Sequence, residues 1–275
     1  MPTGSTRVVA VIGDPVRHSL SPVILGAAFE AAGLDWACVA FEVAAGHGIG
    51  ALEAMRTLGL AGLSVTMPHK ADAARGVDVL TPSAARLGAV NCVSWEGARL
   101  VGNNTDGLGL VRALEADPGI ELSGMSVGVV GAGGAARSII SAVGESGAER
   151  VVVVNRSRPA AEAAVELAPA VARLGGLADL AGCDVVINAT PVGMGSDAAM
   201  AIPREVLRAG QIVVDIVYHP LDTPLLGAAR EVGATAVNGL GMLIGQAELA
   251  FETWTGLGAP TDSMRLAATA ALARA

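Results

Sequence analysis

The chain has 275 residues, of which 52% are hydrophobic and 16% are charged. At about 150 residues per domain this length allows one or two domains, and the composition excludes a disordered chain or a coiled coil. Only three Phe, three Trp and one Tyr are present, and the formal net charge is -8. We therefore expect no nucleic-acid partner, because such proteins use basic surfaces and stacked aromatic rings.

Three further features bear on the location of the protein. The first apolar run, from Val8 to Ile12, is too short for the core of a signal peptide. No stretch of about 18 uncharged apolar residues occurs, so we expect no membrane span and no membrane partner. Cys38, Cys92 and Cys183 are widely spaced and match no zinc-binding or disulfide pattern. We expect a cytoplasmic protein with buried thiols and no bound metal.

Short β-branched runs alternate with Ala- and Leu-rich segments of helical length. The runs predict strands at residues 8–12, 37–43, 62–66, 89–94, 126–130, 150–154, 184–188, 211–216 and 234–237. Residues 241–255 and 261–275 are predicted to form helices on either side of a break that contains Gly and Pro. This alternation is typical of an α/β protein with parallel sheets. We expect a domain boundary near residues 103–106, before a new strand–helix–strand unit that opens at residue 126.

The predicted strand 126–130 runs into a glycine-rich turn and then a helix. The turn reads Gly131-Ala132-Gly133-Gly134-Ala135. Missing Cβ atoms let the backbone approach a diphosphate, and the helix N-terminus supplies N–H donors. The alternative is a turn that is glycine-rich for conformational reasons alone. Because the strand and the helix stand where the dinucleotide fingerprint requires them, the turn predicts a dinucleotide site.

The end of the next predicted strand indicates which dinucleotide binds. Sites for NAD usually carry an acidic residue there, which binds the ribose 2′-hydroxyl. This chain has Asn155-Arg156-Ser157-Arg158 and no carboxylate. A guanidinium group suits a 2′-phosphate because it donates paired hydrogen bonds. The segment favours NADP, the alternative being a basic turn that faces solvent.

Two serines precede the first predicted helix, in the segment His18-Ser19-Leu20-Ser21-Pro22. Ser21 as the N-cap, with Pro22 in the first turn, would explain that pair structurally. Ser19 has no such explanation. Two hydroxyl groups at a helix start would suit a carboxylate ligand.

Two polar clusters follow in the N-terminal half. Lys70 comes shortly after the strand that ends at Thr66, near the start of a helix. The helix dipole opposes a lysine in this place, so proton transfer explains Lys70 better than a solvated charge does. Asn91 and Asp106 belong to segments 88–92 and 102–107. Asp106 has the alternative role of capping the helix that follows it.

A series of motifs, in order along nearly the whole chain, resembles the shikimate dehydrogenase family. The motifs are HSLSP at 18–22, SVTMPHK at 64–70, GAVN at 88–91, NNTDG at 103–107, GAGGA at 131–135, NRS at 155–157, NATPVGM at 188–194, DIVYHPLDTPLL at 215–226 and GLGMLIGQAELAFETW at 239–254. Any one of them is weak evidence. The ordered set is highly specific.

The resemblance implies an NADP-dependent oxidoreductase that reversibly reduces 3-dehydroshikimate to shikimate, in aromatic amino-acid biosynthesis. It implies a two-domain α/β fold closed by C-terminal helices. Residues 1–105 plus 239–275 would form a mostly parallel substrate-binding domain, and residues 106–238 a Rossmann-type NADP-binding domain. The site would lie in the cleft between these domains. The sequence leaves the oligomeric state open, with a homodimer as one alternative.

The resemblance also implies roles for individual residues. Lys70 and Asp106 would act at the reacting oxygen. The substrate would be a small molecule bound by six residues: Ser19, Ser21, Thr66, Asn91, Tyr218 and Gln246. NADP would be bound by the five residues of the glycine-rich turn, Gly131, Ala132, Gly133, Gly134 and Ala135. Seven further residues would bind it too: Asn155, Arg156, Ser157, Arg158, Thr190, Ile216 and Gly239.

Some alternatives stay open within this resemblance. The family usually has a basic residue five positions after Asn155, where this chain has Ala160, so either Arg156 or Arg158 could dominate the 2′-phosphate contact. Relatives that accept quinate often have threonine in place of Ser21, which favours shikimate here. A relative that uses quinate or an aminated shikimate is one alternative, and a catalytically silent NADP-binding sensor is another. Lys70 together with Asp106 argues against the sensor, which needs no such pair.

Overall fold

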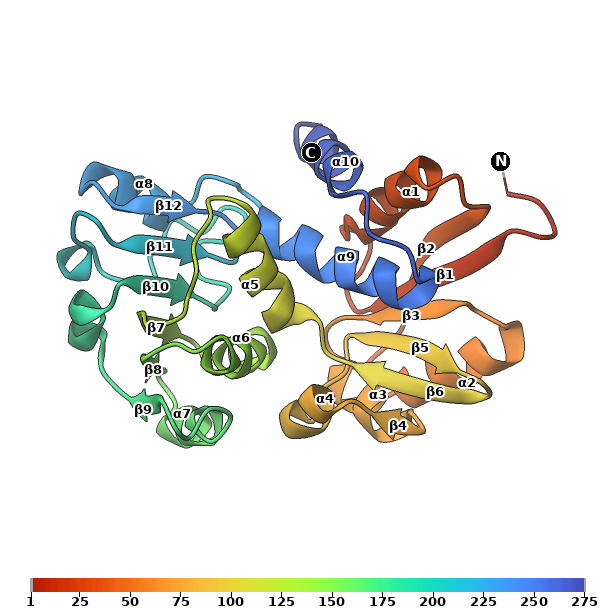
Figure 1. The fold of residues 1–275 in the computed structure, drawn as a ribbon, viewed down its shortest axis with the longest axis horizontal. Coiled ribbons are helices and arrows are strands. Elements are labelled where there is room, and N and C mark those ends of the chain that lie inside the picture. Colours follow the sequence, from red (N-terminus) through yellow and green to blue (C-terminus); the bar gives the residue numbers. More distant parts are fainter. Residues whose placement is uncertain (1, 275) are drawn as a thin grey trace. The chain divides into compact units, whose positions relative to one another are not determined.

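The computed structural model describes residues 2–274, which divide into two compact units. The first unit comprises the residues up to Thr105 together with those from Gln246 onward. The second unit comprises Asp106–Gly245. Each unit is built on one six-stranded sheet (Figure 1). The α/β architecture predicted from the sequence is confirmed.

The sheet of the first unit has the strand order β2-β1-β3-β5-β6-β4. Its strands are β1 (Arg7–Gly13), β2 (Trp36–Glu42), β3 (Gly62–Val65), β4 (Val79–Leu80), β5 (Cys92–Glu96) and β6 (Arg99–Asn103). β1 pairs in parallel with β2 and β3, and β4 with β6, whereas β5 runs antiparallel between β3 and β6. The sheet is therefore mostly parallel, as predicted, with one reversed strand.

Helices cover both faces of this sheet. They are α1 (Ser21–Ala31), α2 (Gly48–Leu58), α3 (Lys70–Gly76), α4 (Pro82–Leu87), α10 (Thr261–Leu272) and the end of α9 (Leu240–Thr255). Buried residues of α2, α3 and α4, such as Leu52 and Met55, pack on Ala10 and Ile12 of β1. The helix predicted at 261–275 ends at Leu272, and Ala275 lies outside the described residues.

Residues from both ends of the sequence complete the first unit. The ring of Phe29 in α1 lies 5.3 Å from that of Trp36 in β2 and 5.7 Å from that of Phe251 in α9, measured between centroids. The indole Nε1 of Trp254 donates a 3.0 Å hydrogen bond to the Val93 carbonyl oxygen in β5. Helix α1 also packs against α10. The C-terminal helices are therefore part of the core of this unit.

The sheet of the second unit is wholly parallel, with the order β12-β11-β10-β7-β8-β9 (Figure 1). Its strands are β7 (Ser126–Val130), β8 (Arg150–Val154), β9 (Ala172–Leu174), β10 (Val185–Asn188), β11 (Ile212–Asp215) and β12 (Thr235–Val237). The order reverses direction between β7 and β10, which is typical of a doubly wound Rossmann-type sheet. The predicted Rossmann-type unit is confirmed.

Helices lie on both faces of this sheet too. They are α5 (Asp106–Ala116), α6 (Gly134–Glu145), α7 (Arg158–Val165) and α8 (Pro224–Glu231), with the short 3₁₀ helices η1 (Leu177–Gly182) and η2 (Arg204–Val206). Val151 and Val153 of β8 pack with α5, α6 and α7, whereas Val152 and Val154 pack with η1 and α8. Successive residues of a strand point to opposite faces, so a strand covered on both sides is apolar throughout.

Candidate active site

The predicted substrate residues near the strands of the first unit lie at one edge of its sheet. The carboxyl ends of β1, β3 and β6 and the amino end of β5 form this edge, because β5 is reversed. Each predicted residue stands beside one of these ends: Ser19 and Ser21 after β1, Thr66 and Lys70 after β3, and Asn91 before β5. The structure therefore gathers residues that are up to 72 positions apart in the sequence at one edge.

Hydrogen bonds between Asn91 and Thr105 hold this edge together. Asn91 Nδ2 donates to Thr105 Oγ1 at 3.0 Å, and the Thr105 backbone N–H donates to Asn91 Oδ1 at 2.7 Å. Thr105 Oγ1 lies 3.2 Å from the Gln246 carbonyl oxygen, and Val90 N–H donates to the Lys70 carbonyl at 2.9 Å. The backbones of Lys70, Asn91, Thr105 and Gln246 are thus brought together.

Thr105 is a residue that the sequence reasoning missed. It lies inside the NNTDG motif, is 2% exposed and directly precedes Asp106. Asp106 is the first residue of α5, in the second unit, and is 7% exposed. Its place in that motif was the available signal in the sequence; the burial of its hydroxyl, which calls for a hydrogen-bond partner, is seen only in the structure.

Lys70 is the first residue of the short helix α3 and is half-buried. The turn before it is anchored by His69, which is fully buried and whose Nε2 lies 2.6 Å from the Val43 carbonyl oxygen. The His69 N–H also donates to the Thr66 carbonyl oxygen at 3.0 Å. The position from which the Lys70 side chain starts is therefore fixed by packed backbone.

The capping explanation for Ser21 is wrong. Leu20 occupies the N-cap position of α1, Ser21 is already helical, and no side chain caps this helix. The Ser21 backbone N–H instead donates to Ser19 Oγ at 3.3 Å. Helix capping thus leaves the buried Ser21 hydroxyl unexplained, and a ligand contact remains the better account.

The predicted cofactor residues lie at the carboxyl edge of the second sheet. Gly131 follows β7, Asn155 follows β8, Thr190 comes shortly after β10, Ile216 follows β11 and Gly239 comes shortly after β12. Backbone hydrogen bonds join neighbouring segments: Gly131 N–H to the Val154 carbonyl at 2.8 Å, Ala189 N–H to Val130 at 2.8 Å, Ile216 N–H to Asn188 at 3.1 Å and Gly239 N–H to Val217 at 3.1 Å. Ligands of open parallel sheets bind at this edge.

The glycine-rich turn has the geometry that a diphosphate requires. Gly131 has φ +121°, and a Cβ there would lie 2.8 Å from the Ala189 carbonyl oxygen, so only glycine fits. At Gly133 and Gly134, in contrast, a Cβ would meet no atom within 4 Å. These two glycines begin helix α6, with Gly133 at the N-cap. The residues present therefore fit a diphosphate, which could approach the backbone N–H groups from the open side.

The two arginines after β8 have different surroundings. Arg158 Nε donates to Glu162 Oε1 at 2.8 Å on the exposed side of α7. Arg156 is exposed and makes no hydrogen bond or ion pair with any residue in the described part of the chain. Asn155 shapes the turn, because its Nδ2 donates to the Ser157 carbonyl at 3.0 Å. Arg156 is therefore the guanidinium group that is available to a ligand without breaking a contact.

A buried polar network, which the sequence reasoning also missed, underlies the loops after β10 and β11. Asn188 and Asp215 are fully buried and Thr223 is 2% exposed. Asn188 Oδ1 accepts hydrogen bonds from the N–H and the hydroxyl of Thr190, at 3.0 and 2.7 Å. Burial raises the pKa of Asp215, and hydrogen bonds only partly offset that effect. For both Asn188 and Asp215, the signal in the sequence was a polar residue that ends an apolar strand run.

Tyr218 and Gln246 complete the predicted set. Tyr218 follows β11 in the second unit and is half-buried, and burial raises the pKa of its hydroxyl. Gln246 lies in α9 and belongs to the first unit. Lys70 and Asp106 are likewise divided between the units. Each of these residues is therefore positioned by the unit to which it belongs.

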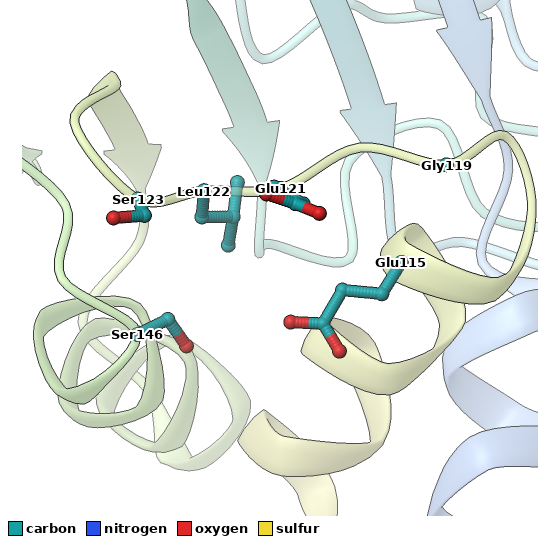
Figure 2. A pocket seen from close by; sticks show the side chains of 6 residues that line it. All are labelled: Glu115, Gly119, Glu121, Leu122, Ser123 and Ser146. Atoms are coloured by element: carbon teal, nitrogen blue, oxygen red, sulfur yellow. The ribbon is translucent and has the colours of Figure 1, made fainter.

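A separate pocket of about 350 Å³ lies at the opposite edge of the second sheet (Figure 2). It is lined by Glu115, Gly119, Glu121, Leu122, Ser123 and Ser146. Ser123 precedes β7 and Ser146 follows α6, so the pocket is at the amino ends of the strands. The carboxylates of Glu115 and Glu121 would repel a diphosphate. The pocket is thus unsuited to a dinucleotide.

Residues 2–274 contain neither a membrane-spanning helix nor a metal-binding cluster. Within that range, no helix is both long enough and apolar enough to span a membrane. No cluster of three His, Cys, Asp or Glu side chains is arranged to hold a metal in the same part of the chain. The three cysteines are free thiols, and burial raises the pKa of both Cys38 and Cys92 to about 12.

Comparisons with known proteins place these features in a family. Residues 11–93 match the shikimate dehydrogenase substrate binding domain, and residues 239–268 match the shikimate 5'-dehydrogenase C-terminal domain. Residues 126–219 match a family described as NADP oxidoreductase, coenzyme F420-dependent. The family models thus cover parts of both units.

Whole-chain relatives agree. A shikimate dehydrogenase (NADP(+)) of Geobacter sp. is 45% identical, over 98% of this chain and 97% of its own length. The crystal structure of shikimate 5-dehydrogenase from Thermus thermophilus, in complex with NADP(H) and shikimate, has a TM-score of 0.90 at 38% identity and covers 96% of this chain and 99% of that one. Quinate dehydrogenase from Corynebacterium glutamicum, in complex with NAD, has a TM-score of 0.87 at 29% identity, with coverages of 96% and 99%. The resemblance seen in the motifs is confirmed: this chain belongs to the shikimate dehydrogenase family.

Proposed function

We propose that this chain is an NADP-dependent shikimate dehydrogenase that reversibly reduces 3-dehydroshikimate to shikimate. The observation that carries the proposal is the full-length relationship to enzymes of that name, combined with the Lys70–Asn91–Thr105 cluster. A sensor without catalysis would not require a lysine held at this edge. Residues 1–105 plus 239–275 are assigned to the substrate and residues 106–238 to the cofactor.

The substrate is bound through its carboxylate and hydroxyl groups. Ser19 and Ser21 donate to the carboxylate, which also meets the N-terminal end of α1. Thr66, Asn91, Tyr218 and Gln246 donate to or accept from the remaining oxygens. Asn91 donates one amide hydrogen to Thr105, which holds its side chain at this edge of the sheet.

The chain's own contribution to the chemistry is control of a proton. NADPH, when bound, supplies the hydride that reduces the carbonyl carbon. Lys70 donates a proton to the carbonyl oxygen as that carbon is reduced, and takes the proton back in the reverse direction. Asp106 accepts a hydrogen bond from the same hydroxyl and orients it.

The cofactor is bound by the carboxyl edge of the second sheet. Gly131 to Ala135 receive the diphosphate, with N–H donors at the start of α6. Asn155, Arg156, Ser157 and Arg158 surround the 2′-phosphate, with Arg156 as the main contact. Thr190, Ile216 and Gly239 flank the rest of the cofactor.

The test is an assay of absorbance at the reduced nicotinamide band, with shikimate or quinate and with NADP or NAD. We expect activity with shikimate and NADP. Quinate carries an additional hydroxyl and a puckered ring, and burying an unpaired hydroxyl costs about 1–3 kcal/mol, so kcat/KM should favour shikimate by about 10- to 100-fold. Ser21→Ala should raise the KM for shikimate more than it lowers kcat.

The relative named quinate dehydrogenase supports a second candidate function. Comparable kcat/KM values for quinate and shikimate would assign the chain to that branch. Activity with neither would support the sensor.

A cytoplasmic location agrees with the three free cysteines, since a reducing compartment keeps thiols unpaired. A homodimer is tested by light scattering after gel filtration.

A further inference from the structure

Asp215, at the end of β11, is a fully buried carboxylate with three hydrogen-bond donors around it. Asn188 Nδ2 donates to Oδ1 at 3.0 Å, the Val217 N–H donates to Oδ1 at 3.1 Å, and Thr223 Oγ1 donates to Oδ2 at 2.7 Å. No lysine or arginine forms an ion pair with it in the described part of the chain. A buried charge that lacks a cation is costly, so its retention calls for an explanation.

The three groups around Asp215 are all hydrogen-bond donors, so residue 215 must present a hydrogen-bond acceptor at both of its side-chain oxygen positions. A backbone N–H can only donate. Asn188 uses its Oδ1 to accept from Thr190, so its amide nitrogen is the atom that faces Asp215. Thr223 Oγ1 accepts from the Leu226 N–H at 3.3 Å as the N-cap of α8, so its proton is directed to Asp215. An asparagine at 215 would present one donor to a site made of donors.

The residues that donate to Asp215 are connected to the predicted cofactor contacts, either along the chain or through hydrogen bonds. Asn188 also holds Thr190 and donates to the Val192 carbonyl at 3.1 Å, which fixes the loop after β10. Val217 lies between Ile216 and Tyr218, and its carbonyl accepts from the Gly239 N–H at 3.1 Å. Thr190, Ile216 and Gly239 are thus each within one residue or one hydrogen bond of a group that Asp215 orients.

We propose that Asp215 is a positioning residue that fixes the loops after β10 and β11 and thereby sets the affinity for the dinucleotide beyond its diphosphate. The inference rests on the proposed function, because it takes Thr190, Ile216 and Gly239 as cofactor contacts. Its role is not general stabilisation. A buried carboxylate opposed by desolvation adds little to stability, so its value lies in the loop geometry that it enforces.

The test compares Asp215→Asn with Asp184→Asn. Asp184 is the control for position, because it also stands at a strand end of the same sheet and accepts from the N–H and hydroxyl of Ser126, at 2.9 and 2.6 Å, although it is exposed and lies 3.9 Å from Arg208. It lies at the amino edge, far along the strands from the predicted cofactor residues. For each protein we would measure the Kd for NADP by fluorescence titration, the KM for NADP and shikimate, kcat, and Tm.

We expect Asp215→Asn to weaken NADP binding by about 10- to 100-fold, as expected when a charged hydrogen-bond partner is replaced by a mismatched one. The KM for shikimate should change less than the Kd for NADP. The buried donor mismatch should lower Tm, but the protein should remain folded at the temperature of the titration. Asp184→Asn should lower Tm and leave the Kd for NADP unchanged. Thr223→Val should weaken NADP binding in the same direction, and Thr223→Ser, which keeps the donor, should restore it. The threonine pair keeps the test decisive if Asp215→Asn fails to fold.

Two results would overturn the inference alone: wild-type affinity for NADP in both Asp215→Asn and Thr223→Val, or a loss of affinity that simply follows a fall in Tm in every variant. A wild-type protein that does not bind NADP would overturn the proposed function instead, and the inference with it. The wild-type titration therefore separates the two failures.

Discussion

The two units prepare their ligand-binding edges by different means. The first unit presents side chains, namely Ser19, Ser21, Thr66 and Lys70, beside a neutral pair of hydrogen-bonded residues, Asn91 and Thr105. The second unit presents backbone, made accessible by missing Cβ atoms at Gly131, Gly133 and Gly134, above a buried carboxylate. Side-chain donors and acceptors suit a substrate rich in hydroxyl groups, whereas backbone N–H groups suit a diphosphate. Substitutions at these side chains of the first unit should therefore act on catalysis and substrate binding, and substitutions in the glycine-rich turn on cofactor affinity. Asp106 and Tyr218 are the exceptions, because they lie in the second unit.

The largest effect is expected from Lys70→Ala. A positioned acid–base group contributes about 10²–10⁴-fold, so kcat should fall by that order while the KM for shikimate changes far less. Arg75→Ala is the control, since it removes a cation from the same helix at an exposed side chain, which pairs with Asp72. Steady-state kinetics would measure both. A near-normal kcat in the Lys70 variant would contradict the proposed role of Lys70 in proton transfer.

The next effect concerns cofactor choice. Arg156→Ala should raise the KM for NADP by about 10- to 150-fold, because one charge-assisted contact is worth about 1.5–3 kcal/mol. The KM for NAD should hardly change. Arg158→Ala is the internal control and should have a smaller effect, since Glu162 already engages that guanidinium. Equal wild-type efficiency with NAD and NADP would contradict this prediction.

Two glycines of the same turn should behave differently. Gly131→Ala forces a side chain into a strained φ and towards the Ala189 carbonyl, at a cost of about 1–3 kcal/mol, so both Tm and NADP affinity should fall. Gly133→Ala has open space and an ordinary φ, so only NADP affinity should fall. Thermal melts with and without NADP separate the outcomes. A stable Gly131→Ala protein would show that the close approach is dispensable.

The smallest effect is a difference in pH dependence. The pKa of Asp215 is raised by burial, so folding binds its proton more tightly and stability is lost as pH rises through that raised pKa. The pKa of Asp184 is lowered by hydrogen bonds from Ser126, so its contribution is present at neutral pH and lost as pH falls through the lowered pKa. Urea unfolding between about pH 3 and 7 should show Asp215→Asn gaining on the wild type as pH rises above about 4. Asp184→Asn should lose relative to the wild type as pH rises from about 3 to 5 and change little above that range.

Much of the architecture could be predicted because buried strands carry a strong signal. Val127 to Val130 and Val151 to Val154 belong to β7 and β8, whose predicted bounds are those of the structure. Three strands were missed: β4 has two residues, β9 has three, and β6 contains Arg99, Gly102 and Asn103. Gly97, with φ +61°, marks the tight turn into β6 and was the unused signal. Short strands take their stability from partners, which a local pattern does not reveal.

The candidate site residues could be predicted from the motifs, but the contacts between those residues could not. Asn188, Asp215, Thr223 and Thr105 stand inside the quoted motifs, but their roles depend on side-chain contacts across 8 to 27 positions of sequence. Such hydrogen bonds form only when separate strand ends meet at a sheet edge. The alternative that Ser21 caps the helix is wrong because the chain enters α1 one residue earlier, at Leu20.

The discontinuous first unit has a consequence for the order of events during synthesis. Phe29 and Trp36 leave the ribosome long before Phe251, and Val93 long before Trp254, although these residues pack together in the finished protein. All six strands of the second unit are complete by Val237, before those C-terminal partners exist. A nascent chain can therefore assemble its dinucleotide unit while the surface of β1 and β2 is still uncovered. The unit that carries Lys70 is finished last, so a chain cut short before α9 would keep all six strands of the second sheet and lack part of the cover of the first.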